Sequence, residues 1–230
     1  EAAALLARLG CAVPCLDRDE AGNAAAAAAI RKAGGAADAF AADVTRPETV
    51  HAAVAAALDR YGRIDALVNC AGVTGKTAIV SHEVDLEDFD RVYAINLRGA
   101  LVVSQAVLPA MLERGRGDIV VTGSIAALST YPGGSIYAAS KHAVHAFCDG
   151  LRKDIANEPL RLIEIMPGTV KTGFAAARRH GDEDEGDAFY NSYPNVLSPE
   201  DIAHTIMAVL ALPGHINVDS LVVTPTGDKG

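Results

Sequence analysis

Short apolar runs alternate with longer amphipathic stretches along nearly the whole 230-residue chain. The apolar runs are continuous and do not alternate with polar residues, which is typical of strands buried on both faces. Strands of this kind, each followed by a helix, form a parallel sheet covered by helices on both sides. Because no linker rich in Pro, Ser or Gly divides the pattern, it predicts one doubly wound α/β domain over residues 1–230.

Local signals set the expected element boundaries. Strands are predicted over 10–16, 36–42, 64–68, 118–122, 161–166 and 220–223. Helices are predicted before Gly10, over 19–33, between Thr45 and Gly62, over 85–114 and 137–157, and from Ser198 onward. Thr45, Pro47 and Glu48 match a helix start in which Thr45 is the cap. Pro14 conflicts with an interior strand, because it lacks a backbone donor, and it predicts a bulge there.

Charge and cysteine content exclude several classes of function. The 20 basic residues are outnumbered by 29 acidic ones, which argues against nucleic acid as the main partner. No uncharged apolar run approaches 18 residues, so no membrane span is expected. Cys11 and Cys15 lie too far apart on an extended strand to form a disulfide. We therefore expect reduced cysteines and a cytoplasmic protein. We also expect no metal site, because no Cys/His cluster has the spacing of metal ligands.

Polar or small residues follow three of the predicted strands. They therefore lie at the carboxyl ends of the strands, where parallel α/β folds bind ligands. Asp17 ends the first strand, and in a dinucleotide-binding fold an acid at this position accepts hydrogen bonds from the adenosine ribose hydroxyls and repels a 2′-phosphate. Asp43, followed by Val44, ends the second strand and is placed to meet an adenine. Each acid has the alternative of being a solvated turn residue. The third strand leads into residues that let a ligand approach the backbone closely: Asn69, Cys70, Ala71 and Gly72.

Tyr137 and Lys141 are four residues apart and share one face of the predicted helix 137–157. A neighbouring ammonium favours the phenolate and lowers the pKa of a tyrosine from about 10 toward neutrality. A phenol tuned in this way can donate and accept a proton near pH 7. The spacing also arises by chance on exposed helices. Ser124, just after strand 118–122, and the segment 167–172, after the next strand, favour a functional interpretation.

In combination and in this order, these residues resemble the short-chain dehydrogenase/reductase family over essentially the whole chain. The residues that carry the resemblance are Asp43, Val44, Asn69 to Gly72, Asn96, Ser124, Tyr137, Lys141, Pro167, Gly168, Val170 and Thr172. The resemblance implies a Rossmann-type fold. It also implies an oxidoreductase that moves a hydride between NAD, or alternatively NADP, and a small alcohol or ketone.

The family implies a catalytic role for four of these residues. Tyr137 would be the acid/base, and Lys141 would lower its pKa and bind the nicotinamide ribose. Ser124 would hydrogen-bond the substrate oxygen, and Asn96 would hold a water of the proton relay beside Lys141. A regulatory or scaffolding protein that only binds a dinucleotide is the alternative, but such a protein does not need all four residues.

The remaining matches concern the cofactor. The segment Pro167–Thr172 would contact the nicotinamide, with Val170 and Thr172 holding its carboxamide. Asp17 falls where family members that prefer NAD over NADP carry an acid, so NAD is the expected cofactor. Cys70 departs from the asparagine usual in the family, at a position where the cofactor's contacts are largely with backbone.

A second departure concerns the start of the sequence. The family opens on a strand and a glycine-rich turn, whereas Glu1–Gly10 matches the helix that follows that turn. The absent turn would place a helix N-terminus against the pyrophosphate. The absent strand would be central, and both its neighbours would expose unpaired edges without it. We therefore expect the sequence to lack an N-terminal part of the family pattern.

The substrate and the assembly are less closely defined. Residues 174–197 match a substrate-covering loop, in which Arg178 and Arg179 either clamp a carboxylate or are simply solvated. Segments 131–137 and 213–226 resemble the subgroup that oxidises serine and other 3-hydroxy acids, which is commonly NADP-linked. Residues 72–99 look more like general 3-oxoacyl or sugar-alcohol reductases. The family also implies a homotetramer or homodimer, built through the helices predicted over 85–114 and 137–157.

Overall fold

The computed structural model describes residues 1–76, 78–174, 187, 188, 190, 191, 193 and 195–227. Its strands are β1 (Ala12–Asp17), β2 (Ala36–Ala41), β3 (Ala66–Asn69), β4 (Gly117–Thr122), β5 (Leu160–Pro167) and β6 (Ser220–Val223). Its main helices are α1 (Ala2–Arg8), α2 (Glu20–Lys32), α3 (Pro47–Tyr61), α4 (Leu86–Tyr93), α5 (Gly99–Arg114), α6 (Ser135–Asp154) and α9 (Pro199–Leu210). Single turns lie at Ser81–Glu83, Ala94–Arg98 and Ile125–Ala127.

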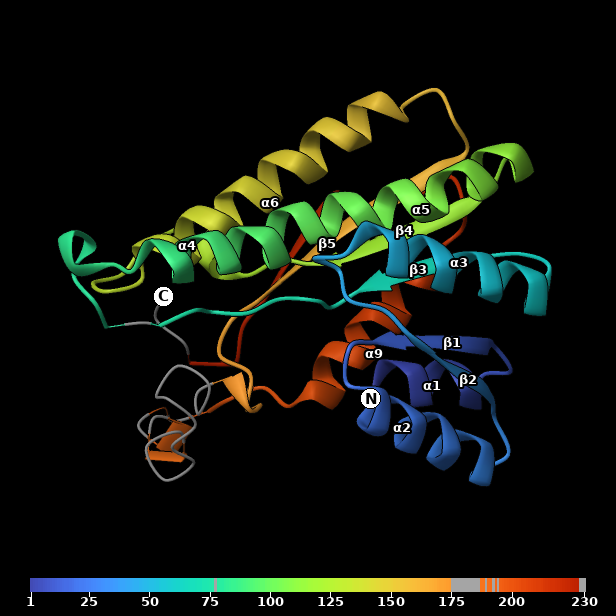
Figure 1. Cartoon of the computed structure of the whole chain (residues 1–230), viewed down its shortest axis with the longest axis horizontal. Coiled ribbons are helices and arrows are strands. Elements are labelled where there is room, and N and C mark those ends of the chain that lie inside the picture. Colours follow the sequence, from blue (N-terminus) through green and yellow to red (C-terminus); the bar gives the residue numbers. More distant parts are fainter. Residues whose placement is uncertain (77, 175–186, 189, 192, 194, 228–230) are drawn as a thin grey trace.

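All of the strand pairings are parallel, as the continuous apolar runs predict. The strands form two sheets, one with the order β1-β2 and one with the order β3-β4-β5-β6. Among the described residues, β1 therefore pairs only with β2, and β3 pairs only with β4. Helices α3, α5 and α6 lie on one side of the strands, and α1, α2 and α9 lie on the other (Figure 1).

The core follows this layering. Side chains of α3, α5 and α6 pack against β3, β4 and β5 around fully buried Met111 and Ile119. On the opposite side, Ile202 and Ile206 of α9 pack against Ile163 and Ile165. All eight residues of β5 are buried, as expected for a strand that has β4 on one side and β6 on the other.

Two local expectations were wrong. Pro14 forms no bulge, because the β1-β2 ladder runs without interruption from Ala12 to Asp17. A proline is tolerated there since β1 is an edge strand among the described residues. Thr45 does not cap α3. The residue before the helix is Arg46, which makes no side-chain cap, and Thr45 instead hydrogen-bonds Asp43.

The predicted helix 85–114 is nearly continuous, and it is divided by a π turn at Ala94–Arg98. Pro109 lies within α5 and does not end it. By length and composition alone, Leu86–Arg114 is apolar enough to cross a membrane, and half of its most apolar stretch is buried inside the fold. The core helix of a water-soluble protein has the same character, so the absence of a membrane span stays a prediction.

A buried guanidinium fixes the end of α9 to the larger sheet. Arg161 of β5 donates two hydrogen bonds to the carboxylate of Asp118 on β4, at 2.7 and 2.8 Å. It also donates to carbonyl oxygens at and after the C-terminal end of α9, namely those of Val209, Leu210, Leu212 and Ile216. These contacts satisfy carbonyls that a helix end leaves without partners.

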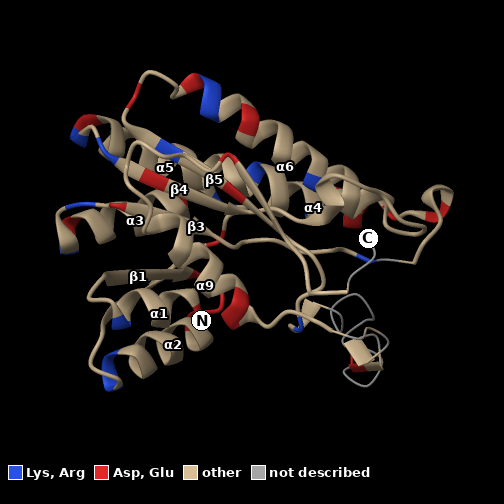
Figure 2. Cartoon of the chain, turned by 180° about the vertical axis from the view of Figure 1, so that it is seen from behind, with Lys and Arg blue, Asp and Glu red and all other residues tan. Residues whose placement is uncertain are grey.

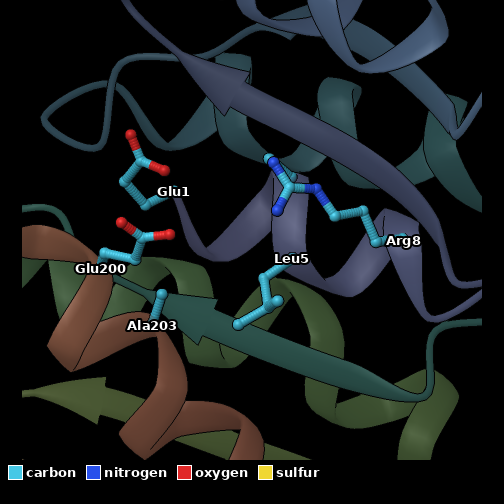
Figure 3. A pocket seen from close by; sticks show the side chains of 6 residues that line it. Glu1, Leu5, Arg8, Glu200 and Ala203 are labelled. Carbon is cyan, nitrogen blue, oxygen red and sulfur yellow. The ribbon is translucent and has the colours of Figure 1, made fainter. Parts of the chain in front are cut away.

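Helices α1 and α9 lie side by side and enclose a small pocket lined by Glu1, Ala4, Leu5, Arg8, Glu200 and Ala203 (Figure 3). None of the predicted site residues lines it. Lys and Arg lie in short stretches on separate elements and not along one face of one element (Figure 2).

Candidate active site

Three structural elements bring the predicted catalytic residues together at the carboxyl ends of β3, β4 and β5. Tyr137 and Lys141 come from the first turns of α6, Asn96 from the π turn before α5, and Ser124 from the end of β4. A Cβ atom placed on Gly72 would stand 3.5 Å from Asn96 Oδ1 and 3.7 Å from Lys141 Nζ. The missing side chain therefore leaves open a space beside both polar groups.

Lys141 is a buried cation, with 5% of its surface exposed. Its ammonium donates a hydrogen bond to the carbonyl of Thr122 at 3.0 Å and lies 5.9 Å from the centroid of the Tyr137 ring. Burial lowers the pKa of Lys141 to about 8, while the carboxylate of Glu164 acts in the opposite direction. The positive charge is thus held close to the phenol, as the four-residue spacing predicts.

Asn96 lies in the π turn, a distortion that is frequent at functional sites. Its Oδ1 accepts a hydrogen bond from the backbone of Val73 at 2.8 Å, and its Nδ2 donates to the Val73 carbonyl at 2.9 Å. Nδ2 also donates to Ser140 Oγ at 2.9 Å, and Ser140 in turn donates to the carbonyl of Tyr137. Asn96 therefore joins the loop after β3 to the helix that carries Tyr137 and Lys141.

Ser124 lies at the start of the turn Ile125–Ala127, which packs against helix α6, the element that carries Tyr137. Ser124 Oγ accepts a hydrogen bond from the backbone of Ala126 at 3.1 Å and so begins the turn Ile125–Ala127. Ala126 packs in one small cluster with buried Tyr137. The ring of Tyr137 also meets Phe174 edge-on, with centroids 6.2 Å apart. The structure thus places Ser124 and Tyr137 around the same region, with Phe174 on its border.

The two predicted adenine-side acids both organise turns. Asp17 Oδ1 accepts a hydrogen bond from the backbone of Asp19 at 2.9 Å, and its side chain is exposed. Asp43 Oδ1 accepts from both Thr45 Oγ1 and the Thr45 backbone, at 2.7 and 2.8 Å, which lowers the pKa of Asp43. Val44 packs into the core against Gly99. The alternative turn role is therefore present at both acids, beside any role toward a ligand.

The segment after β5 is held by backbone contacts. Gly168 donates to the carbonyl of Val223 at 2.8 Å, and Val170 is bridged to Leu197. Tyr190 is a residue that sequence reasoning missed: its hydroxyl accepts from the Thr172 backbone nitrogen at 3.1 Å and donates to the Thr172 carbonyl at 2.9 Å. No local pattern marks Tyr190, because its partner is 18 residues away.

The candidate carboxylate clamp, Arg178 and Arg179, lies outside the described residues, as does most of the acidic run after it. All four cysteines are free. Within the part of the chain that the structure describes, no cluster of three or more His, Cys, Asp or Glu residues is placed to hold a metal ion.

Glu164 and His145 form a second pair that the sequence did not single out as functional. His145 Nδ1 lies 2.6 Å from Glu164 Oε2, and the Glu164 side chain is fully buried. The available signal was a second charged residue, besides Arg161, in the otherwise apolar β5. Only the fold shows that this residue and Lys141 both approach the end of β4, at Gly123 and Thr122.

Comparisons with known proteins identify one family. The short chain dehydrogenase family profile matches residues 1–183. An NADP-dependent 3-hydroxy acid dehydrogenase of Schizosaccharomyces pombe is 33% identical over 189 residues, which cover 82% of this chain and 72% of that protein. Sulfoacetaldehyde reductase 2 of Chromohalobacter salexigens is 35% identical over 185 residues, or 80% of this chain and 73% of that protein.

Among solved structures, the closed form of a serine dehydrogenase complexed with NADP+ superposes with a TM-score of 0.90 at 28% identity. The superposition covers 100% of this chain and 91% of the serine dehydrogenase. The family profile spans most of the chain, and the fold agrees with it. This protein belongs to the short chain dehydrogenase family.

Proposed function

We propose that the protein interconverts a secondary alcohol and a ketone with NAD or NADP, and that Tyr137 is the acid/base. The observation that carries this proposal is the buried ammonium of Lys141, which lies 5.9 Å from the Tyr137 ring. A buried cation is costly, and such groups cluster at functional sites because their chemistry requires them. A protein that only binds a dinucleotide has no need to pay this cost beside a phenol.

The chain's own residues supply the proton chemistry. During oxidation, Tyr137 accepts the proton of the substrate hydroxyl, and during reduction it returns that proton to the carbonyl oxygen. The charge of Lys141 favours the phenolate form of Tyr137, and Ser124 donates a hydrogen bond to the substrate oxygen. The bound nicotinamide supplies the hydride acceptor or donor.

Several residues fit a bound dinucleotide. The open space at Gly72, beside Lys141 Nζ and Asn96 Oδ1, suits the hydroxyls of a nicotinamide ribose. The segment Pro167–Thr172 is fixed on two sides and would hold the carboxamide through Val170 and Thr172. Asp43 keeps one carboxylate oxygen outside its bonds to Thr45, which suits an adenine amino group.

NAD is the proposed cofactor, because the exposed carboxylate of Asp17 would repel a 2′-phosphate. The similar proteins favour NADP instead, because a 3-hydroxy acid dehydrogenase and a serine dehydrogenase among them are named with NADP. The two cofactors must therefore be compared directly.

The proposed substrates are 3-hydroxy acids or 3-oxoacyl compounds. The support is that similar proteins are named for a 3-hydroxy acid, serine and sulfoacetaldehyde, all of which carry an acidic group. A 3-ketoacyl-ACP reductase from Sinorhizobium meliloti has a TM-score of 0.84 at 25% identity, covering 97% of this chain and 91% of that one. A substrate-covering role for residues 174–197 belongs to the same proposal.

We also propose that the protein is cytoplasmic and assembles as a homotetramer or homodimer through α4, α5 and α6. Helices α4 and α5 follow one another in one long stretch, and α6 runs alongside it on the same face (Figure 1). Leu86, Leu101 and Leu112 are exposed on α4 and α5, which suits a covered surface. Light scattering should give the mass of two or four chains, and a monomer would contradict this arrangement.

The test of the proposed function is a matrix of two cofactors against a panel of substrates. Secondary alcohols, 3-hydroxy acids and 3-oxoacyl esters are each assayed with NAD(H) and with NADP(H) by nicotinamide absorbance. Turnover with 3-hydroxy acids and NAD is expected. Dinucleotide binding without turnover of any substrate would favour the regulatory alternative.

A further inference from the structure

Glu164 is a buried acid with an incomplete set of partners. None of its side-chain surface is exposed, and one oxygen, Oε2, is held by His145 Nδ1 at 2.6 Å. The other oxygen, Oε1, has no hydrogen-bond partner, a condition shared only with Ser104 Oγ among the buried side chains that the structure describes. A buried carboxylate is costly without a compensating charge, so its position calls for a nearby cation.

Two basic side chains act on Glu164: His145 through the hydrogen bond, and Lys141 through the charge of its ammonium. Both groups approach the end of β4: the ammonium of Lys141 donates to the carbonyl of Thr122, and Glu164 Oε1 lies against Gly123. A Cβ atom on Gly123 would stand less than 3.0 Å from Glu164 Oε1, so only a glycine leaves room for the carboxylate there. The electrostatic attraction of Glu164 favours the charged form of Lys141.

We propose that Glu164 is a positioning residue for the reaction, and that its buried carboxylate keeps Lys141 protonated beside Tyr137. His145 holds the carboxylate in place from the partly exposed face of α6, one turn after Lys141. The proposal rests on the proposed function, since it assigns Glu164 a role in keeping the Lys141 charge available to the acid/base.

The charges around the pair are consistent with this role. Burial lowers the pKa of Lys141, and the negative charge of Glu164 raises it. The resulting pKa of Lys141 is about 8. Burial raises the pKa of Cys148 to about 12, so this thiol stays neutral and does not replace Glu164 as the counter-charge. The other titratable groups that face the pair are His145, with Asp149 beyond it, Tyr137 on the same helix and Cys70 after β3.

The test compares the pH dependence of kcat/KM for alcohol oxidation in wild type, Glu164→Gln and Glu164→Asp. Glu164→Gln removes the charge at nearly constant shape, whereas Glu164→Asp keeps the charge. His142→Gln is the matched control, because His142 lies beside Lys141 on α6 but hydrogen-bonds the backbone of Ala138. Cofactor affinity and circular dichroism are measured for each variant, and Glu164→Met replaces Glu164→Gln if the latter does not fold.

Loss of the Glu164 charge should move the alkaline limb of the profile to lower pH by about one unit. The activity ratio of wild type to Glu164→Gln should therefore stay near one in acid and grow to about tenfold on the alkaline side. Glu164→Asp and His142→Gln should keep the limb near its wild-type position. A limb that does not move, or an equal loss of activity at every pH, would overturn the proposal. Inactive wild type would instead count against the proposed function.

Discussion

The side chain of Asn96 donates a hydrogen bond to Ser140 Oγ at 2.9 Å, and this contact links the π turn before α5 to helix α6, which carries Tyr137 and Lys141. Ser140 Oγ in turn donates a hydrogen bond to the backbone carbonyl of Tyr137 at 2.8 Å. Tyr137, the proposed acid/base, is therefore positioned by a hydrogen-bond network and not only by the packing of its helix. Networks of this kind are best measured by removing their members separately and together.

Asn96→Ala removes three hydrogen bonds and leaves the backbone of Val73 unpaired. We expect the free energy of unfolding to fall by about 2 kcal/mol and kcat to fall about tenfold. Ser140→Ala should cost about 1 kcal/mol, and the double variant should show a coupling of about 1 kcal/mol. Urea denaturation and steady-state kinetics measure both effects. Strict additivity of the two substitutions would argue against the network, and Asn157→Ala in the exposed turn after α6 is the control.

Arg161→Ala tests the buried contact between the larger sheet and α9. The substitution leaves Asp118 without its partner and frees the carbonyls at the end of the helix, so we expect a loss of about 3 kcal/mol in the free energy of unfolding. Arg63→Ala breaks the exposed pair with Asp65 and should change stability little. Thermal denaturation distinguishes the two variants. Similar small changes for both would show that the buried contact does not stabilise the fold.

Asp17→Ser should shift the cofactor preference toward NADP. The variant removes the carboxylate that would repel a 2′-phosphate under the proposed NAD preference, and we expect the ratio of kcat/KM for NAD over NADP to fall by about tenfold. Asp19→Ser is the control, because this neighbouring acid caps α2 and serine is also a good cap. If wild type prefers NADP, or if both variants behave alike, Asp17 does not set the preference.

The pH profile of the wild-type enzyme reports on Lys141. An ordinary lysine stays charged to about pH 10, but burial lowers the pKa of Lys141 to about 8. The ammonium is present below this pKa and is lost as the pH rises through it, so its support of the phenolate disappears on the alkaline side. We expect kcat/KM for alcohol oxidation to decrease above about pH 8. A profile that stays level to pH 10 would mean that the charge of Lys141 does not support turnover.

The repeating pattern predicted the helices and strands well, because burial on both faces leaves a strong local signal. Strand 220–223 matches β6, and the other strands agree within about two residues. The pairing of the strands into two sheets is not local information. Thr45 shows a related limit: it has the features of a helix cap, but Asp43 provides a better partner for its hydroxyl.

The candidate site shows the same division. Tyr137 and Lys141 are recognisable because helix geometry relates positions four residues apart. Glu164 and Tyr190 are not, because their partners lie 19 and 18 residues away in sequence and meet them only through the fold. Asn96 was expected beside Lys141, but its contacts with Val73 and Ser140 become visible only in three dimensions.

The central claim is that the phenol of Tyr137 transfers the proton of the reaction. Its most direct test is the turnover of Tyr137→Phe, which removes one hydroxyl, measured together with cofactor affinity. Tyr93→Phe is the matched control, because it also removes one tyrosine hydroxyl. Tyr93 lies in α4, and its ring packs against that of Phe89. We predict that Tyr137→Phe loses turnover by at least about a hundredfold while its cofactor affinity and folding remain those of wild type. Retention of wild-type turnover by Tyr137→Phe would contradict the assignment.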